Sequence, residues 1–83
     1  MQKQEMLVRD INLVKYAQLD EKMEALTKIR YKDPGTMSTL EQAGNKMKVT
    51  FYNNVTGIAP GQSAVFYDGD DVIGGGFIEK QTY

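Results

Sequence analysis

Short stretches that alternate apolar and polar residues recur along this chain, at spacings of about 8–12 residues. The clearest covers residues 46–52, where Met47, Val49 and Phe51 alternate with lysine, threonine and tyrosine. A period of two is typical of a strand with one buried face and one wet face. Turn sequences such as Asp33-Pro34-Gly35 separate the stretches. We therefore expect an all-β fold, a small closed or partly open antiparallel β-barrel of about six strands.

The expected strands cover most of the chain. They lie near residues 7–14, 27–31, 36–42, 46–52, 63–67 and 72–78. In the first of these, one face is expected to carry Leu7, Arg9, Ile11 and Leu13. In the last, Gly74-Gly75-Gly76 is expected to allow a sharp bend or the close approach of another backbone.

Residues 15–26 fit more than one structure. Apolar residues fall at helical spacing there, namely Tyr16, Leu19, Met23 and Leu26. Asp20 could also cap a helix. Against a helix, the run that follows alternates like a strand and ends in a strong turn. We place a loop or short turn at residues 15–22, and helix, loop and strand remain open for the segment as a whole.

The length of the chain suits a single domain. Its 83 residues are enough for one hydrophobic core, and 41% of them are hydrophobic and 25% charged, as in ordinary soluble globular proteins. No internal repeat, linker or low-complexity tract interrupts the pattern. We expect residues 1–83 to form one domain.

The chain contains no cysteine and no histidine. Disulfides, zinc sites of the usual Cys/His kind, thiol nucleophiles and imidazole catalysis are therefore excluded. The net charge of −1 also excludes the strongly basic balance of most free-standing nucleic-acid-binding domains, so any RNA contact must be local. No long apolar run is present, and we expect a soluble, cytoplasmic protein.

Three motifs could carry chemistry, and each has a plainer reading. Ser63 follows a glycine turn, but a nucleophile elbow needs a small residue where Val65 stands. Clustered aspartates at residues 68–71 could bind a cation, but Asp-Gly is typical of a hairpin tip. The triple glycine at 74–76 lacks the lysine and helix of a phosphate-binding loop. We predict no catalytic residue, no metal ligand and no cofactor site in this chain.

Basic residues gather in the middle of the sequence. Between residues 28 and 48 these are Lys28, Arg30, Lys32, Lys46 and Lys48. The first three share a parity, so a strand would project them from one face, and the other two could extend the stripe. With Tyr31 and Tyr52 nearby, such a stripe could hold an RNA backbone and stack on a base. The alternative is that these basic residues only form part of the solvent-exposed outer face of a small barrel.

A resemblance covers nearly the whole chain. Residues 57–78, GIAPGQSAVFYDGDDVIGGGFI, resemble the C-terminal signature of the tRNA-specific 2-thiouridylases, formerly named tRNA (5-methylaminomethyl-2-thiouridylate)-methyltransferases. The runs at 8–12, VRDIN, and 28–32, KIRYK, are similar to the same family in order and approximate spacing. Three motifs in the same order make this resemblance specific.

The resemblance implies an enzyme of three parts: an N-terminal ATP-pyrophosphatase domain, a central domain and a terminal β-barrel related to those of aminomethyltransferases and elongation factors. Such enzymes adenylate the wobble uridine of tRNA and then transfer sulfur from a cysteine persulfide. This chain resembles the barrel only, so we expect a piece of a longer enzyme without activity of its own. ATP, magnesium and the persulfide sulfur donor protein would then bind the missing domains.

Two sets of site residues follow as hypotheses. The candidate tRNA-binding residues are Lys28, Arg30, Tyr31, Lys32, Lys46, Lys48 and Gln62. The candidates for packing against the N-terminal and central domains are Pro60, Gly61, Gly74, Gly75 and Gly76. The alternatives are a purely structural or protein-interaction barrel without RNA contact, or a stand-alone protein-binding barrel.

Overall fold

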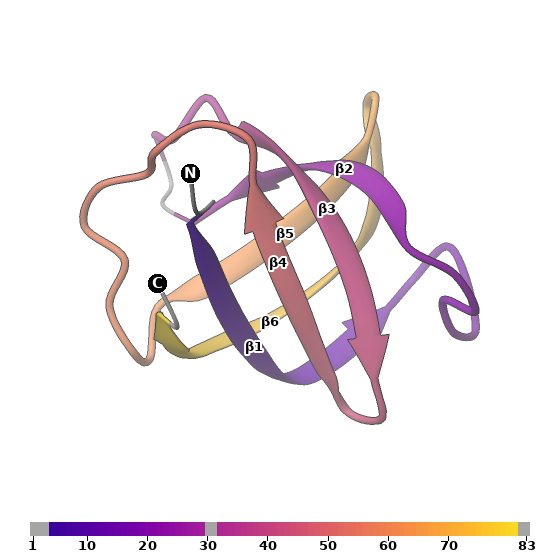
Figure 1. Ribbon diagram of the computed structural model, residues 1–83. Coiled ribbons are helices and arrows are strands. Elements are labelled where there is room, and N and C mark those ends of the chain that lie inside the picture. Colours follow the sequence, from indigo (N-terminus) through magenta and orange to yellow (C-terminus); the bar gives the residue numbers. More distant parts are fainter. Residues whose placement is uncertain (1–3, 30–31, 82–83) are drawn as a thin grey trace.

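The alternating segments close into a six-stranded antiparallel barrel in the computed structural model, which describes residues 4–29 and 32–81 (Figure 1). The strands are β1 (Glu5–Leu13), β2 (Met23–Lys28), β3 (Thr36–Ala43), β4 (Lys46–Phe51), β5 (Ser63–Asp68) and β6 (Asp71–Gln81). Their order around the barrel is β1-β4-β3-β2-β5-β6, and every neighbouring pair is antiparallel. The expected all-β barrel is therefore confirmed. In the described residues, no helix is long and apolar enough to cross a membrane.

Inward-facing side chains from all six strands fill the barrel. Met47, Val49 and Phe51 on β4 are at most 1% exposed, as their alternation predicts. The other buried apolar residues are Met6, Val8, Ala25, Ile29, Leu40, Ala64, Phe66, Ile73 and Ile78. Burial of these side chains is the main favourable contribution to folding, at about 25 cal/mol per Å² of apolar surface.

Strand β1 departs from the expected single period. Met6 and Val8 are fully buried, whereas further along Ile11 and Leu13 are the residues that pack on the core. Between these pairs the register with β6 shifts, and Asp10 adopts a φ of 51°. Such a bulge reverses which parity faces inward, and aspartate tolerates this backbone better than most residues. Leu7 was therefore wrongly assigned to the face of Ile11 and Leu13.

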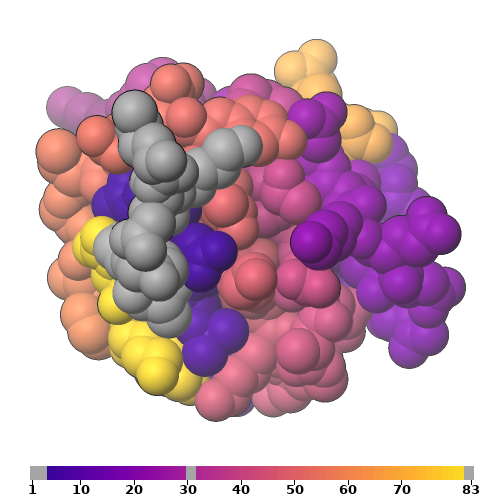
Figure 2. All heavy atoms as spheres, viewed as in Figure 1, coloured from indigo at the N-terminus to yellow at the C-terminus, as the bar shows by residue number. Residues whose placement is uncertain are grey.

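The ambiguous segment resolves into a loop and a strand. Residues 14–22 form the loop, as predicted for 15–22, and β2 begins at Met23. Helical spacing fails here because Ala25 and Thr27 must both face the interior, where they are 2% and 1% exposed. In Figure 2 this loop protrudes from one side of the barrel.

Strand β2 ends at Lys28, earlier than the predicted strand at 27–31. The Asp33 carboxylate accepts hydrogen bonds from the backbone N–H groups of Ile29 and Gly35, both at 2.9 Å. The Asp33 side chain thus provides the hydrogen-bond acceptors for these two N–H groups, in place of the backbone carbonyls of a neighbouring strand. Arg30 and Tyr31 lie outside the described residues.

The long loop between β4 and β5 covers one end of the barrel (Figure 1). Val55 and Ile58 in this loop pack against the core. The Gln4 side chain anchors the loop, since its Oε1 accepts from Val55 N–H at 2.6 Å and its Nε2 donates to Val55 O at 2.8 Å. The loop is thus held to the beginning of β1.

The triple glycine of β6 lies where that strand passes between β1 and β5. A Cβ on Gly74 would stand 2.4 Å from Asn12 O, and one on Gly75 would stand 2.6 Å from Ala64 O. On Gly76 it would stand 2.6 Å from Arg9 O. The predicted close approach of another backbone is confirmed, and the approaching backbones belong to this barrel.

One polar pair is buried inside the barrel. The hydroxyls of Thr27 and Ser38 lie 2.6 Å apart, and Ser38 Oγ also donates to Ala25 O at 3.0 Å. Both residues are at most 1% exposed. Their hydrogen bonds compensate for the loss of water that burial imposes.

We expect Gly76→Ala to lower the free energy of unfolding by about 2–3 kcal/mol, because the added methyl meets a ladder carbonyl and Val8 in a filled core. Ser63→Ala, an exposed change on the neighbouring strand, should alter it by less than about 0.5 kcal/mol. Urea denaturation followed by circular dichroism measures both. Equal free energies of unfolding for the two variants would show that the backbone next to Gly76 can move to make room for a methyl group.

We expect Ser38→Ala to lower the free energy of unfolding by about 1–3 kcal/mol, since it leaves the Thr27 hydroxyl without its partner. The double change Thr27→Val and Ser38→Ala should lose less than the sum of its single changes, because no buried hydroxyl remains. A double-mutant cycle by urea denaturation measures this coupling. Strict additivity would show that the hydroxyls do not depend on one another.

Candidate functional site

The basic residues do not share one stripe. Lys28 ends β2, beside the residue that pairs with Thr36 at the beginning of β3. Lys46 pairs with Ala43 at the opposite end of β3. Seven residue steps along that strand separate the two levels by about 23 Å. Lys32 lies in a turn, so the strand face expected to hold Lys28, Arg30 and Lys32 together does not extend to it.

Lys46 and Lys48 on β4 are each paired with carboxylates. Lys46 Nζ lies 2.9 Å from Glu79 Oε1, and Lys48 Nζ lies 3.5 Å from Glu41 Oε1 and 3.9 Å from Glu5 Oε2. All these side chains are substantially exposed, so the pairs add little stability. They do neutralise the positive charge of this face.

The Tyr52 hydroxyl also interacts with other residues of the barrel surface. Its hydroxyl donates to Glu24 Oε2 at 2.6 Å and lies 3.0 Å from Thr39 Oγ1. Tyr52 is 40% exposed, and its backbone N–H donates to Met37 O at 3.0 Å, at the barrel end that also carries Lys28. These hydrogen bonds hold its side chain over β3 and β2, so its hydroxyl is already engaged by the barrel.

Lys28 and Lys32 differ from the β4 lysines. Within the described part of the chain neither forms an ion pair, and Lys28 Nζ lies 4.9 Å from the centre of the Tyr67 ring on β5. Both stand at the barrel end that carries the β2–β3 turn and the long β4–β5 loop. Their positive charges remain available to an anionic ligand.

The Pro60-Gly61-Gln62 turn lies at this same barrel end and is attached to β6. Gly61 N–H donates to Ile78 O at 2.8 Å, and Ile78 N–H donates to Gln62 O at 2.7 Å. Gln62 Oε1 accepts from Ala59 N–H at 3.1 Å, and Gly61 has a φ of 89°. The side-chain oxygen of Gln62 therefore shapes the turn itself, and Pro60 is exposed at its tip.

The opposite end of the barrel is acidic. Lys15 Nζ, from the β1–β2 loop, lies 3.2 Å from carboxylate oxygens of both Asp68 and Asp71 at the β5–β6 hairpin. Hydrogen bonds to Asp68 and then Asp71 raise the pKa of Lys15 above its ordinary value, so it stays charged at neutral pH. The hairpin carries a third carboxylate, Asp70. No group of three or more metal-ligating side chains occurs in the described ranges.

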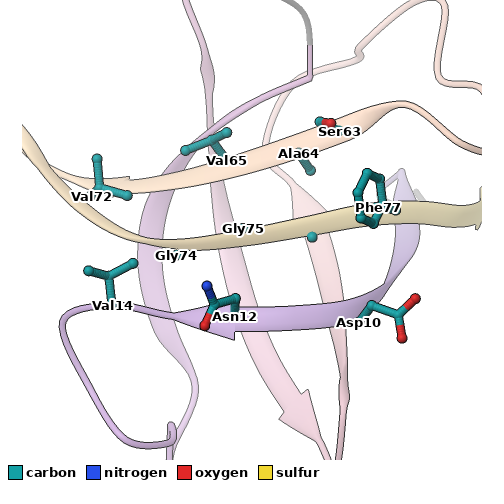
Figure 3. A pocket seen from close by; sticks show the side chains of 11 residues that line it. Asp10, Asn12, Val14, Ser63, Ala64, Val65, Val72, Gly74, Gly75 and Phe77 are labelled. Atoms are coloured by element: carbon teal, nitrogen blue, oxygen red, sulfur yellow. The ribbon is translucent and has the colours of Figure 1, made fainter.

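A hollow of about 360 Å³ lies on the outside of the barrel over β6 (Figure 3). We call it the glycine hollow, because the backbone of Gly74–Gly76 lines it without side chains. Its apolar walls are Val14, Val65, Val72 and Phe77, and polar residues Asp10, Asn12 and Ser63 also border it. Sequence analysis named Gly74, Gly75 and Gly76 as candidates for packing against other domains, but it did not identify the apolar walls or the hollow.

Comparison with known proteins agrees with this architecture. The family model described as "Aminomethyltransferase beta-barrel domain" matches residues 3–78. The chain is 53% identical over 75 residues to a protein of Amoebophilus asiaticus named tRNA-specific 2-thiouridylase MnmA, covering 89% of this chain and 20% of that one.

Two further relatives carry similar names. A tRNA-specific 2-thiouridylase MnmA of Cytophaga hutchinsonii is 58% identical over 57 residues, covering 69% of this chain and 16% of that one. A tRNA-specific 2-thiouridylase MnmA 1 of Clostridium botulinum (strain Okra / Type B1) is 40% identical over 77 residues, covering 92% and 22%. The chain thus spans about a fifth of the length of these curated relatives.

Proposed function

The chain belongs to the aminomethyltransferase β-barrel domain family, and on that premise we propose that it acts as a non-catalytic accessory domain of a tRNA 2-thiouridylase. The observation that carries the proposal is 53% identity, over nearly the whole chain, to one fifth of a protein named for that activity. The remaining domains would carry out the sulfur transfer to tRNA. They would also bind ATP and magnesium and receive sulfur from a persulfide donor protein.

The residue inventory supports a non-catalytic role. The chain has neither cysteine for a persulfide nor histidine for proton transfer. Ser63, the nucleophile considered from the sequence, is an exposed residue at the border of the glycine hollow. The proposed contribution of the domain is therefore binding and positioning.

We further propose that the end of the barrel bearing Lys28 and Lys32 contacts the tRNA backbone. Among residues 4–29 and 32–81, neither lysine is paired with a carboxylate, and the turn at residues 60–62 lies at the same end. Arg30 and Tyr31 lie between them in sequence and belong to this proposal. The acidic β5–β6 hairpin lies at the opposite end, where it would repel phosphate.

The alternative is a purely structural domain without RNA contact. It is favoured by the ion pairs of Lys46 and Lys48, which already neutralise two of the candidate RNA-binding residues. Under this alternative the exposed lysines at the other end serve solubility alone.

A hybrid enzyme tests the accessory role. In it, this chain replaces the matching fifth of the Amoebophilus asiaticus relative. We expect the hybrid to form 2-thiouridine in tRNA, and the isolated 83-residue chain to form none, as measured by mass spectrometry of tRNA nucleosides. A correctly folded hybrid without activity, beside an active parent, would contradict the proposal.

The tRNA contact is tested in the same hybrid enzyme by two matched double variants. Lys28→Ala with Lys32→Ala should weaken tRNA binding and reduce the salt slope of log K by about 2, because two phosphate contacts are lost. Lys46→Ala with Lys48→Ala removes the same charge but should change the slope by less than about 0.5, since these lysines are already paired. Filter binding at several salt concentrations measures both.

The comparison separates specific contact from net charge. If the two double variants had equal salt slopes, the weaker tRNA binding would be due to the loss of overall positive charge. Unchanged affinity and slope for Lys28→Ala with Lys32→Ala would remove the tRNA contact and favour the structural alternative.

A further inference from the structure

The glycine hollow is an apolar depression on the outer surface of a barrel whose interior is already filled. Val14 is 71% exposed, Phe77 44% and Val72 43%, and all three border one floor, with Val72 and Phe77 at its two ends (Figure 3). Single exposed apolar residues are ordinary, but several gathered around a depression mark a binding surface. The proposed tRNA contact uses none of these residues.

The hollow accepts backbone as well as side chains. Its floor is main chain of Gly74–Gly76, so a partner can approach the β6 strand more closely than any side chain on these positions would allow. Figure 3 shows Asn12 and Ser63 on opposite sides of this floor, from β1 and β5. An apolar side chain fits the centre, and polar groups of the same partner can meet the border.

Charge does not favour a nucleic acid in this position. Asp10 at the border of the hollow is paired with Arg9 at 2.6 Å, and the Arg9 guanidinium lies 5.4 Å from the centre of the Phe77 ring. A phosphate backbone would find no excess of positive charge here, whereas an uncharged protein segment needs none. Strand addition is also excluded at this site, because β6 is paired on both sides by β1 and β5.

The length of the relatives points to a partner. About four fifths of their chains lie outside the region similar to this one, and domains joined in one chain commonly share an interface. We propose that the glycine hollow seats an uncharged, apolar segment from another domain of the same enzyme. This inference rests on the proposed accessory function.

Thiol labelling tests the proposal, because this chain has no cysteine of its own. Val72→Cys places one thiol at the hollow, and Met37→Cys places a matched thiol on β3, on the opposite side of the barrel. The two parent side chains are equally exposed, at 43%. Maleimide labelling is followed by peptide mass spectrometry in the isolated chain and in the hybrid enzyme without tRNA.

We expect the Val72→Cys thiol to react at least 10-fold more slowly in the hybrid enzyme than in the isolated chain, and the Met37→Cys thiol to react equally in both. Val14→Cys, at a second wall of the hollow, should behave as Val72→Cys does. Equal rates in both proteins at residues 72 and 14 would overturn the proposal.

Other occupants give distinct results. Protection in the isolated chain that grows with protein concentration would mean that a second copy covers the hollow, and would overturn the proposal. If the thiols were protected only after tRNA was added, RNA would be the ligand of the hollow, and the proposal would be overturned. Protection in a hybrid that fails to thiolate tRNA would support the docking surface while the proposed function fails.

Discussion

The close passage of β6 between β1 and β5 is the constraint on which the barrel depends. Carbonyl oxygens of both neighbours stand where a Cβ on Gly74, Gly75 or Gly76 would have to be. A side chain there would have to displace these backbones, so it would weaken the closure of the barrel. Closure in turn pairs every strand on both sides, so this domain can offer a partner only its outer faces and its two ends.

The same glycines connect stability with recognition. Their missing side chains let the strands approach, and they also leave the uncovered floor of the glycine hollow. The walls of that hollow come from three parts of the chain: the loop after β1 with Val14, the middle of β5 with Val65, and β6 itself with Val72 and Phe77. A feature required for closing the barrel thereby becomes a surface on which another domain can pack.

Charge divides the two ends of the barrel. The β5–β6 hairpin carries three carboxylates against the ammonium of Lys15, whereas Lys28 and Lys32 lie at the other end without carboxylate partners in the described residues. On the side, Lys46 and Lys48 are neutralised by Glu79, Glu41 and Glu5. This distribution supports a domain that meets RNA at one end and protein elsewhere, although its net charge is only −1.

The sequence by itself determined the fold class, most strand positions and the loop at 15–22, because period-two patterns and turn residues are local signals. Its resemblance to a family rested on the motifs at residues 8–12, 28–32 and 57–78. The inward face of β4 followed directly from the alternation of Met47, Val49 and Phe51. Tertiary structure decided what depends on register. The bulge at Asp10 reversed the inward parity of β1, Asp33 ended β2 at Lys28, and strand order placed Lys46 far from Lys28. The glycine hollow likewise exists only where β1, β5 and β6 meet, because its walls are distant in sequence and are brought together by closure of the barrel.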